Sequence, residues 1–394
     1  MKIPMSSPDI TDAERQAVME VINTPILSLG PKVVEFEKSF CEYTGAKHAI
    51  AVNSGTAGLH LTVRAAGISA GDLVITTPFS FVASTNALLF ENAVPIFVDV
   101  DPVTGNIDPD LVTMAARDLM MGGKTAEKWL PRDFPGKSER GLGKLKAILP
   151  VDVFGQPAAL GPIAAVARQY GLTLIEDSCE AIGATYKGQK AGTHGEYGIF
   201  AFYPNKQMTT GEGGMIITND DQAANFMRAL RNQGRAPGDT WLSHTYLGYN
   251  YRLDEMSAVL GLAQLRRLDE MLAKREAVAG WYSQGLAGIP GIEIPVIVPE
   301  TTRMSWFVYV IRLSREIDRA ELAKRLEARG VPIRPYFLPI HLQPYMQERF
   351  GYLEGDFPIT EDLGQRGVAV PFSGVMTREQ VEYVCAVLKV EIDR

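Results

Sequence analysis

A single lysine just before a cluster of glycines is the feature of the sequence with the clearest chemical potential. Lys206 stands in Phe202-Tyr-Pro-Asn-Lys-Gln-Met-Thr-Thr-Gly-Glu-Gly-Gly214, between the end of an apolar run and glycines that permit close backbone approach. A lysine held in a tight, partly desolvated site can serve as an amine nucleophile or as a base. Taken alone, the segment could also be a hairpin turn with a surface lysine, so its chemistry depends on what lies nearby.

Two other segments could supply partners for such a lysine. In Val52-Asn-Ser-Gly-Thr-Ala-Gly-Leu-His-Leu61 a loop of small residues leads into an apolar helical pattern, and free N–H groups at a helix start bind anions. In Leu172-Thr-Leu-Ile-Glu-Asp-Ser-Cys-Glu-Ala181 an apolar strand ends in Glu176 and Asp177, where ligands of α/β sheets bind. Each segment has an ordinary alternative, the capping of a helix. Together, the three segments match the needs of pyridoxal 5'-phosphate (PLP), namely a phosphate cradle, an acid beside the pyridine nitrogen and a lysine for the aldehyde.

The composition is that of a folded globular protein. The chain has 394 residues, of which 46% are apolar and 22% charged, enough for two domains with sizeable cores. A net charge of -7 argues against electrostatic binding of nucleic acid. The three cysteines are far apart, so we expect a reducing, cytoplasmic compartment rather than a disulfide framework or a zinc ribbon. We expect no secretory signal, and no membrane span, because no apolar run approaches the roughly 18 residues that a span needs.

Motifs of several other enzyme classes are absent. Gly123-Lys124-Thr125 looks like the end of a phosphate-binding P-loop, but the glycine that the motif needs five residues before Gly123 is Asp118. The sequence has no GxGxxG, HExxH, CxxC or GxSxG motif. Its five histidines lack metal-ligand spacing, so we expect no metal site.

Apolar strand-like runs alternate with helical stretches through the first part of the chain. Thr11 and Glu14 have the spacing of a capping box, and Asp108-Pro109 opens another helix. This alternation predicts an α/β domain with a largely parallel sheet. The expected strands are 73–77, 94–98, 146–150, 172–176, 197–202 and 215–218, and the expected helices are 81–90, one between 150 and 172, and one after Asp220.

The character of the sequence changes after Arg252. Residues 253–286 form one helical stretch with few breakers, which we expect to cross from one domain to the next. We therefore predict a large cofactor-binding domain over 1–252, and a linking helix with a small C-terminal domain over 253–394. The small domain is expected to be α+β, with a β-rich piece at 304–313, a helix from about 318 to 329 and a last helix after Thr377. Residues 120–146 are expected to be a surface insertion or long loop.

The chain resembles the DegT/DnrJ/EryC1/StrS family of PLP-dependent sugar aminotransferases over nearly its whole length, apart from the 120–146 insertion. The most specific match is the block at 202–214. The resemblance implies the fold-type-I aminotransferase architecture, with a mostly parallel mixed sheet between helices and a smaller C-terminal α+β domain. The other matching pieces are Asn53-Ser-Gly-Thr56, Phe81-Val-Ala-Ser84, Phe154-Gly-Gln-Pro157, Glu176-Asp-Ser-Cys-Glu180, Gly248-Tyr-Asn-Tyr-Arg252 and Pro335-Tyr-Phe-Leu-Pro-Ile-His341.

The resemblance also implies roles for individual residues. Lys206 aligns with the lysine that bonds covalently to the cofactor, and Asp177 with the carboxylate that binds its pyridine nitrogen. Phe81 aligns with an aromatic ring that stacks on the cofactor. Asn250 aligns with an asparagine that reaches the phosphate in the other subunit, which implies a homodimer with shared active sites. The remaining implied contacts are Gly55, Thr56, Ala57, Ser178 and Glu180 with the cofactor, and Arg334, Tyr336 and His341 with the substrate.

Three positions depart from the pattern that many family members share. Ala201 stands where many relatives have a serine that hydrogen-bonds the phosphate, so that contact is missing or comes from Ser178 or another donor. Glu180 stands where many members have glutamine or histidine, and some perosamine-type 4-aminotransferases also have glutamate there. Asp152 occupies a position that is commonly histidine.

We therefore expect a PLP-dependent aminotransferase that moves an amino group from an amino acid, with L-glutamate as the expected donor, to a nucleotide-linked keto-sugar. In that chemistry Asp177 keeps the pyridine nitrogen protonated and Lys206 is the base that shifts a proton. One alternative is an enzyme that acts on a ring without a nucleotide, such as a keto-cyclitol or an aminoshikimate-type precursor. Another is a PLP-binding regulator without turnover, which the Lys206 and Asp177 pair and the lack of a basic domain disfavour.

Overall fold

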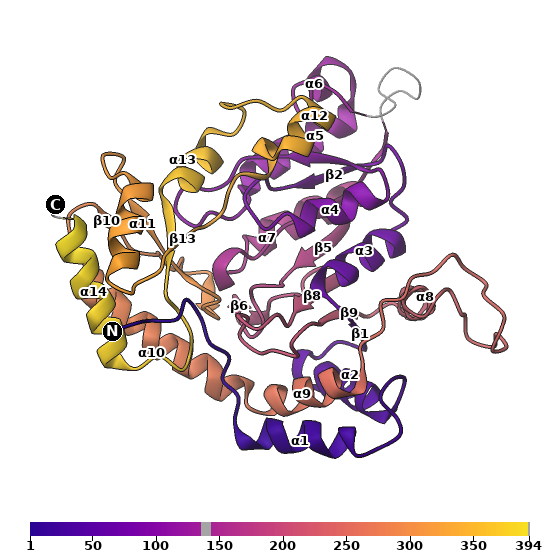
Figure 1. Ribbon diagram of the computed structural model, residues 1–394. Coiled ribbons are helices and arrows are strands. Elements are labelled where there is room, and N and C mark those ends of the chain that lie inside the picture. Colours follow the sequence, from indigo (N-terminus) through magenta and orange to yellow (C-terminus); the bar gives the residue numbers. More distant parts are fainter. Residues whose placement is uncertain (135–142, 393–394) are drawn as a thin grey trace.

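A seven-stranded sheet forms the centre of the larger domain (Figure 1). The computed structural model describes residues 1–134 and 143–392. In order across the sheet, the strands are β1 (His48–Val52), β9 (Gly214–Thr218), β8 (Tyr197–Ala201), β5 (Thr173–Asp177), β4 (Leu145–Leu149), β2 (Leu73–Thr76) and β3 (Val94–Phe97). β9 runs antiparallel to both of its neighbours, and the other strands pair in parallel. The sheet is therefore mixed but mostly parallel, as the sequence predicts.

Helices cover both faces of this sheet because the side chains of each strand alternate between the faces. In β4, Ala147 and Leu149 belong to one core and Ile148 to the other. The result is an α/β/α arrangement of three layers. The first face is covered by α3 (Gly55–Ala65), α4 (Ala83–Phe90) and α8 (Asp221–Arg231). The second face is covered by α5 (Pro109–Met121), α7 (Leu160–Tyr170), α2 (Pro31–Thr44) and α9 (Glu255–Arg266).

The six predicted strands of this domain are all present, with ends shifted by no more than a residue. The predicted helix at 81–90 begins at Ala83, and Asp108 caps α5 by accepting hydrogen bonds from two backbone N–H groups. The sequence interpretation missed β1 and α2. β1 reads His-Ala-Ile-Ala-Val, and its two alanines are weak strand formers, so its pairing with β9 rather than its own propensity places it in the sheet.

The predicted long helix over 253–286 is in fact two helices that meet at Arg267. α9 ends one residue before Arg267, and α10 (Leu268–Leu286) begins one residue after it. The guanidinium of Arg267 donates to Glu14 at 2.7 Å and to Asp9 at 3.1 Å. The start of the chain is thus tied by ion pairs to the junction of the two helices.

The N-terminal helix, α1 (Asp12–Ile22), begins with the predicted capping box. The backbone N–H of Thr11 donates to Glu14 Oε2 at 2.8 Å. Glu14 is almost completely buried, and burial alone would raise the pKa of its carboxyl. Hydrogen bonds from Thr11, Arg267 and Gln264 outweigh burial and lower this pKa to about 2. The network that anchors the N-terminal segment therefore depends on an ionised Glu14.

A four-stranded antiparallel sheet forms the core of the smaller domain. In order, its strands are β10 (Ile292–Glu293), β12 (Tyr309–Leu313), β14 (Gly367–Val370) and β13 (Arg334–Pro335). α10, α11 (Arg319–Ala328) and α14 (Arg378–Ile392) contribute to the same core. A separate three-stranded sheet links the two parts of the chain and consists of β11 (Thr301–Arg303), β6 (Thr185–Tyr186) and β7 (Gln189–Lys190). The strands and helices of this region agree with the predicted α+β domain.

The chain crosses between the two domains more often than a single boundary after residue 252 would require. Ile3 packs in the core of the small domain, although the other buried residues of that core lie between 278 and 388. In the other direction, η2 (Ile340–Leu342) and α12 (Pro344–Phe350) contribute Ile340 and Met346 to a core of the large domain. α13 (Pro358–Arg366) then leads back to β14. The core of the small domain and this core of the large domain therefore each combine segments that lie far apart in the sequence.

The predicted insertion at 120–146 is partly helical. α5 continues to Met121, and the short helix α6 (Gly123–Glu127) follows. Trp129 Nε1 donates to a carboxylate oxygen of Asp118 at 3.0 Å, which ties the segment to α5. Residues 135–142 of the insertion lie outside the described residues. Within the ranges that the structure describes, no helix is long and apolar enough to cross a membrane.

Candidate active site

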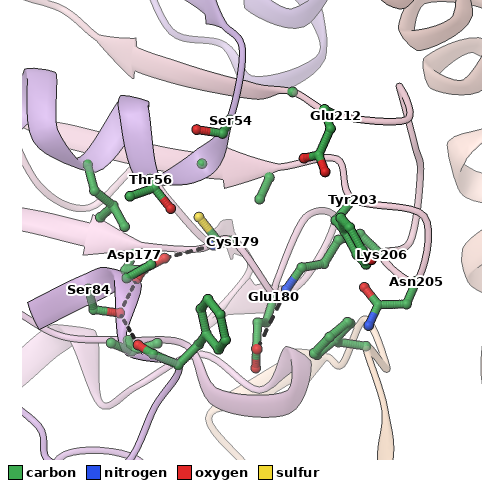
Figure 2. Close-up of a pocket in the computed structure, with 18 of the residues that line it drawn as sticks. Ser54, Thr56, Ser84, Asp177, Cys179, Glu180, Tyr203, Asn205, Lys206 and Glu212 are labelled. Atoms are coloured by element: carbon green, nitrogen blue, oxygen red, sulfur yellow. Dashed lines mark hydrogen bonds and ion pairs between the residues drawn. The ribbon is translucent and has the colours of Figure 1, made fainter. Parts of the chain in front are cut away.

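A cavity of about 430 Å³ lies where the two domains meet, beyond the carboxyl end of β5. β5 brings Asp177 to it, the loop after β8 brings Lys206, and the first turn of α3 brings Gly55 and Thr56. Phe307 from the small domain also lines it. Figure 2 shows Thr56, Asp177 and Lys206 around this common space. The fold thus brings the three segments with chemical potential, those of Lys206, Asp177 and Gly55, together in one site.

The first turn of α3 offers backbone N–H groups to the cavity. Ser54 caps the helix by accepting a hydrogen bond from the N–H of Ala57 at 3.1 Å. The N–H groups of Gly55 and Thr56 precede it and have no partner inside the helix. Gly55 packs directly on β8, because a Cβ atom at this position would lie 2.7 Å from the Cβ of Ala201. This end of the cavity is therefore suited to an anion, and a glycine is required there by close packing.

Asp177 is buried and held in one orientation from two sides. The hydroxyl of Ser84 donates to its Oδ2 at 2.6 Å, and the backbone N–H of Cys179 donates to its Oδ1 at 3.2 Å. Its backbone N–H donates in turn to the carbonyl of Pro150. Burial raises the pKa of the neighbouring Cys179 thiol, so that thiol stays protonated beside the carboxylate. The carboxylate thus faces the cavity as a fixed acceptor.

Lys206 lies between a carboxylate and an aromatic ring. Its Nζ is 3.6 Å from Glu180 Oε1 and 3.7 Å from the centre of the Phe307 ring. The other carboxylate oxygen of Glu180 accepts a hydrogen bond from the N–H of Phe154, in η1 (Val153–Gly155), at 2.9 Å. Burial raises the pKa of Glu180, while the nearby Lys206 ammonium opposes that rise. Glu180 is therefore a carboxyl whose protonation is sensitive to the charge of Lys206.

Arg275 binds backbone carbonyls of two chain segments, the loop that carries Lys206 and the segment that carries Phe307. It is buried in α10, and its guanidinium donates to the carbonyls of Asn205 (3.2 Å) and Lys206 (2.7 Å). It also donates to the carbonyls of Trp306 (3.1 Å) and Phe307 (3.2 Å). Burial lowers the pKa of Arg275 to about 10. One buried cation therefore links the lysine loop of the large domain to the segment of the small domain that carries the ring over the lysine.

Comparison with known proteins agrees with this geometry. The profile of the DegT/DnrJ/EryC1/StrS aminotransferase family matches residues 8–389. The chain belongs to this family. A GDP-perosamine synthase from Caulobacter vibrioides is 39% identical over 391 residues, which make up 98% of this chain and 97% of the relative. A second GDP-perosamine synthase, from Escherichia coli O157:H7, is 33% identical over 97% of this chain and 96% of its own.

A solved structure shows the same architecture. PseC from Helicobacter pylori, an aminotransferase involved in the biosynthesis of pseudoaminic acid, matches with a TM-score of 0.87 and 26% identity over 100% of both chains. The protein is a PLP-dependent aminotransferase with the fold that the sequence predicts. The relatives do not favour the two alternatives, an enzyme for rings without a nucleotide and a regulator without turnover.

The residues of this aminotransferase site fit PLP. The cofactor phosphate needs N–H donors, which the first turn of α3 offers, and its pyridine nitrogen needs a carboxylate, which Asp177 supplies. Lys206 is the lysine of the cavity, and its amine can bond to the cofactor aldehyde. When bound, PLP supplies a ring that withdraws electrons from the carbon next to the transferred amino group. No cluster of potential metal ligands occurs in the part of the chain that the structure describes.

The structure brings most of the predicted cofactor contacts to the cavity. Its lining includes Gly55, Thr56, Phe81, Asp177, Glu180 and Lys206, and also Tyr336 among the predicted substrate contacts. Phe81 is 64% exposed, which is unusual for a phenylalanine. An exposed aromatic ring at the cavity is consistent with stacking on a flat ligand. Each of these contacts stays a prediction.

Five of the predicted contacts do not line the cavity of the single chain. The Ala57 N–H is taken by Ser54. The Ser178 hydroxyl donates to Asp152 Oδ2 at 2.6 Å, so it does not replace the contact absent at Ala201. His341 is fully buried, and its Nε2 lies 2.9 Å from Glu361 Oε1. Arg334 and Asn250 are exposed and are not among the residues that line the cavity.

Asp152, the third departure from the family pattern, lies behind β5. It accepts hydrogen bonds from Ser178 and from the N–H of Ala158, and it is almost completely buried. Burial, together with the nearby carboxylate of Glu176, raises its pKa to about 7. The position therefore supports the strand that carries Asp177 and does not contact the cavity.

Several residues of the site were missed by sequence reasoning. Ser84 was visible inside the matching piece Phe81-Val-Ala-Ser84, but nothing in that piece indicated that its hydroxyl binds Asp177. Glu212 is part of the glycine block, and Figure 2 shows its carboxylate directed into the cavity. Phe307 and Arg275 carry no sequence signal, because an isolated phenylalanine or arginine is common and each reaches Lys206 through the tertiary fold.

Proposed function

We propose that this enzyme transfers an amino group from an amino acid, L-glutamate being the expected donor, to a keto-sugar linked to a nucleoside diphosphate, with GDP as the nucleotide. The observation that carries the proposal is the 39% identity with a GDP-perosamine synthase across 98% of this chain. An aminotransferase that makes a GDP-linked amino sugar must start from the corresponding GDP-linked keto-sugar, because the amino group replaces a carbonyl oxygen. The glutamate at position 180 supports the same substrate group.

Three residues would carry the chemistry. Lys206 Nζ would remove a proton from the α-carbon of the donor and later return one to the sugar carbon, a contribution of roughly 10²–10⁴ in rate. Asp177 would hold a proton on the pyridine nitrogen by a charge-assisted hydrogen bond, and Ser84 and Cys179 orient it for that task. Glu180, 3.6 Å from Lys206 Nζ, would favour the protonated amine between transfers.

The active sites are proposed to be shared between two copies of the chain. The charged residues that line the single-chain cavity are Asp177, Glu180 and Glu212 against Lys206, an excess of negative charge. The phosphate of the cofactor and the diphosphate of the substrate are both anionic, so further donors are needed at the cavity. Asn250 is exposed on the surface and is the candidate that the family resemblance provides. The loop after α8 that leads to Asn250 extends away from the body of the molecule (Figure 1) and exposes Trp241 and Leu242, which suits a protein contact.

A cytoplasmic location stays an expectation from the cysteine content.

Reaction of the purified enzyme with L-glutamate, followed at the absorption band of the cofactor, tests the first half of the reaction. The second half is tested with GDP-, dTDP- and UDP-linked 4-keto-sugars, and turnover should be fastest with the GDP-linked compound. Equal turnover with a keto-inositol would favour the ring-without-nucleotide alternative instead. Borohydride reduction followed by peptide mapping should place the pyridoxyl group on Lys206, and a label on Lys187 or Lys190 would contradict the assignment.

The shared site is tested by mixing two impaired variants, Lys206→Ala and Asn250→Ala. In a mixed dimer both lesions fall in one site, which leaves the other site intact. Heterodimers isolated with two different affinity tags should therefore regain about half of the wild-type activity, the share of one intact site. If they remain no more active than the average of the parents, Asn250 acts within its own chain or not at all.

A further inference from the structure

The motif Gly248-Tyr-Asn-Tyr-Arg252 is anchored by its two tyrosines. The rings of Tyr249 and Tyr251 stack, with centroids 4.9 Å and planes 10° apart. The backbone is fixed as well, because Tyr249 N–H donates to the carbonyl of Leu230 at 2.7 Å and Tyr251 N–H donates to that of Arg231 at 3.0 Å. Side chains alternate in direction along an extended segment, so the residue between the two tyrosines points the other way.

The tyrosine hydroxyls are bound to α3 and to the residue that follows α4. Tyr251 Oη lies 3.1 Å from His60 Nδ1, and Arg64 donates to Tyr249 Oη at 2.7 Å. Glu91 closes the group, because its Oε1 is 2.8 Å from His60 Nε2 and accepts from Tyr249 Oη at 3.3 Å. We call these five residues the tyrosine clamp. His60 is buried in it, so the clamp is a fixed part of the fold.

The backbone of Asn250 is held in place, while its side chain has no hydrogen-bond partner among the described residues. Its backbone carbonyl accepts a hydrogen bond from Asn53 Nδ2 at 3.3 Å. Its side chain is exposed and makes no hydrogen bond within residues 1–134 and 143–392. Because the backbone on which it sits is already fixed, a hydrogen bond from this side chain to a group outside the chain would cost little further ordering.

We propose that the tyrosine clamp positions Asn250 for the active site of a second copy of the chain, where its side-chain amide donates a hydrogen bond to the cofactor phosphate. His60, Arg64, Glu91, Tyr249 and Tyr251 are then positioning residues that act in trans. The inference rests on the shared site of the proposed function. It adds that α3 serves two sites, its own through the N–H groups of Gly55 and Thr56 and the partner's through the clamp.

The variant that tests this idea is Tyr249→Phe/Tyr251→Phe, which keeps both rings and removes both hydroxyls. It should weaken PLP binding about tenfold, the free energy of one hydrogen bond to a charged phosphate, because a misplaced Asn250 amide can no longer make that bond. The affinity for pyridoxal, which has no phosphate, should not change. An equal loss for both compounds, or no loss for PLP, would overturn the proposal. If the double variant does not fold, Tyr251→Phe alone provides the same comparison with a smaller expected effect.

Complementation distinguishes action in trans from action within one chain. Paired with Lys206→Ala in a tagged heterodimer, the clamp variant should restore turnover at limiting PLP toward half of the wild-type value, because both lesions again fall in one site. Paired with Asn250→Ala, it should restore nothing, because each chain then damages its neighbour's site. If the clamp acts instead on the phosphate loop of its own α3, these two outcomes are reversed.

The same set of heterodimers separates this inference from the proposed function. If Lys206→Ala and Asn250→Ala fail to complement each other, the shared site is wrong, and the inference is wrong with it. If they do complement each other but Lys206→Ala and the clamp variant do not, the shared site stands and only the role of the clamp is overturned.

Discussion

Replacing Gly55 by alanine tests whether the first turn of α3 must lie against β8 for the site to work. A Cβ atom on residue 55 would lie 2.7 Å from the Cβ of Ala201 and 3.0 Å from the Sγ of Cys179. Ordinary carbon–carbon contacts are about 3.5–4.0 Å, so the helix start would have to move by roughly 1 Å. Such a move withdraws the N–H groups of Gly55 and Thr56 from a phosphate that they would otherwise bind.

The expected magnitudes follow from that displacement. Overpacking a tight contact costs about 1–3 kcal/mol of stability, and this should appear in urea unfolding of the cofactor-free protein. A weakened hydrogen bond to a charged phosphate costs about 1.5–3 kcal/mol, which predicts a loss of at least tenfold in PLP affinity. The matched control is Gly280→Ala in α10, where a Cβ meets nothing within 4 Å. That variant should gain up to about 1 kcal/mol from helix propensity and bind PLP normally.

Removing the Ala201 methyl group should relieve the collision that Gly55→Ala creates. In Gly55→Ala/Ala201→Gly the two Cβ atoms no longer collide, and the Cα of residue 201 is 3.6 Å from the new methyl group. The double variant should therefore recover part of the lost stability and PLP affinity, with a coupling energy of about 1 kcal/mol or more. If Gly55→Ala is as stable as wild type, or if removing the Ala201 methyl group recovers nothing, the close approach of α3 to β8 is not what shapes the phosphate end.

Three further predictions concern other parts of the site and its support. Asp177→Asn should retain PLP but lose most turnover, because an amide cannot hold a proton on the pyridine nitrogen; near-normal turnover would mean that another residue does so. Arg275→Met leaves four backbone carbonyls without their donor and should cost about 2–4 kcal/mol in urea unfolding and speed PLP release, with partial recovery in Arg275→Lys; unchanged release would show that the arginine does not hold the lysine loop. The pKa of Glu14 falls from 4.5 to about 2 on folding, so its contribution of about 3 kcal/mol is present above pH 4.5 and is lost as the pH falls toward 2. Acid unfolding of Glu14→Gln should lack this loss, and equal acid sensitivity of the two proteins would contradict it.

The alternation of apolar strands and amphipathic helices was enough to predict the central sheet and its layers. The predicted strands are short runs rich in aliphatic or aromatic residues, which can be recognised locally. The break at Arg267 was missed because both flanking segments have helical patterns and no glycine or proline stands between them. At this break the guanidinium binds Glu14 and Asp9, which lie more than 250 residues earlier. Contacts of that range leave no mark on the local sequence.

The residues of the site also fall into those that the local sequence predicts and those that it does not. Lys206, Asp177 and the first turn of α3 could be predicted because each sits at the end of a strand or the start of a helix and carries its chemistry in its residue type. Phe307 and Arg275 could not, because their roles arise from where the small domain meets the lysine loop. The placement of His341 was equally invisible, since nothing in its matching motif indicated that the ring would be buried against Glu361.

Arg275 also explains how the distance between the Lys206 amine and the Phe307 ring can stay fixed although the two residues belong to different domains. Lys206 belongs to the large domain and Phe307 to the small one, yet the amine lies 3.7 Å from the centre of the ring. A rotation of one domain against the other would change that distance if each residue were held only by its own domain. Because a single guanidinium binds the carbonyls of both residues, the amine and the ring move together with α10. A planar cation with several donors in a fixed geometry suits this task, whereas a lysine at 275 has three donors on one nitrogen for the four carbonyls and could replace the arginine only in part.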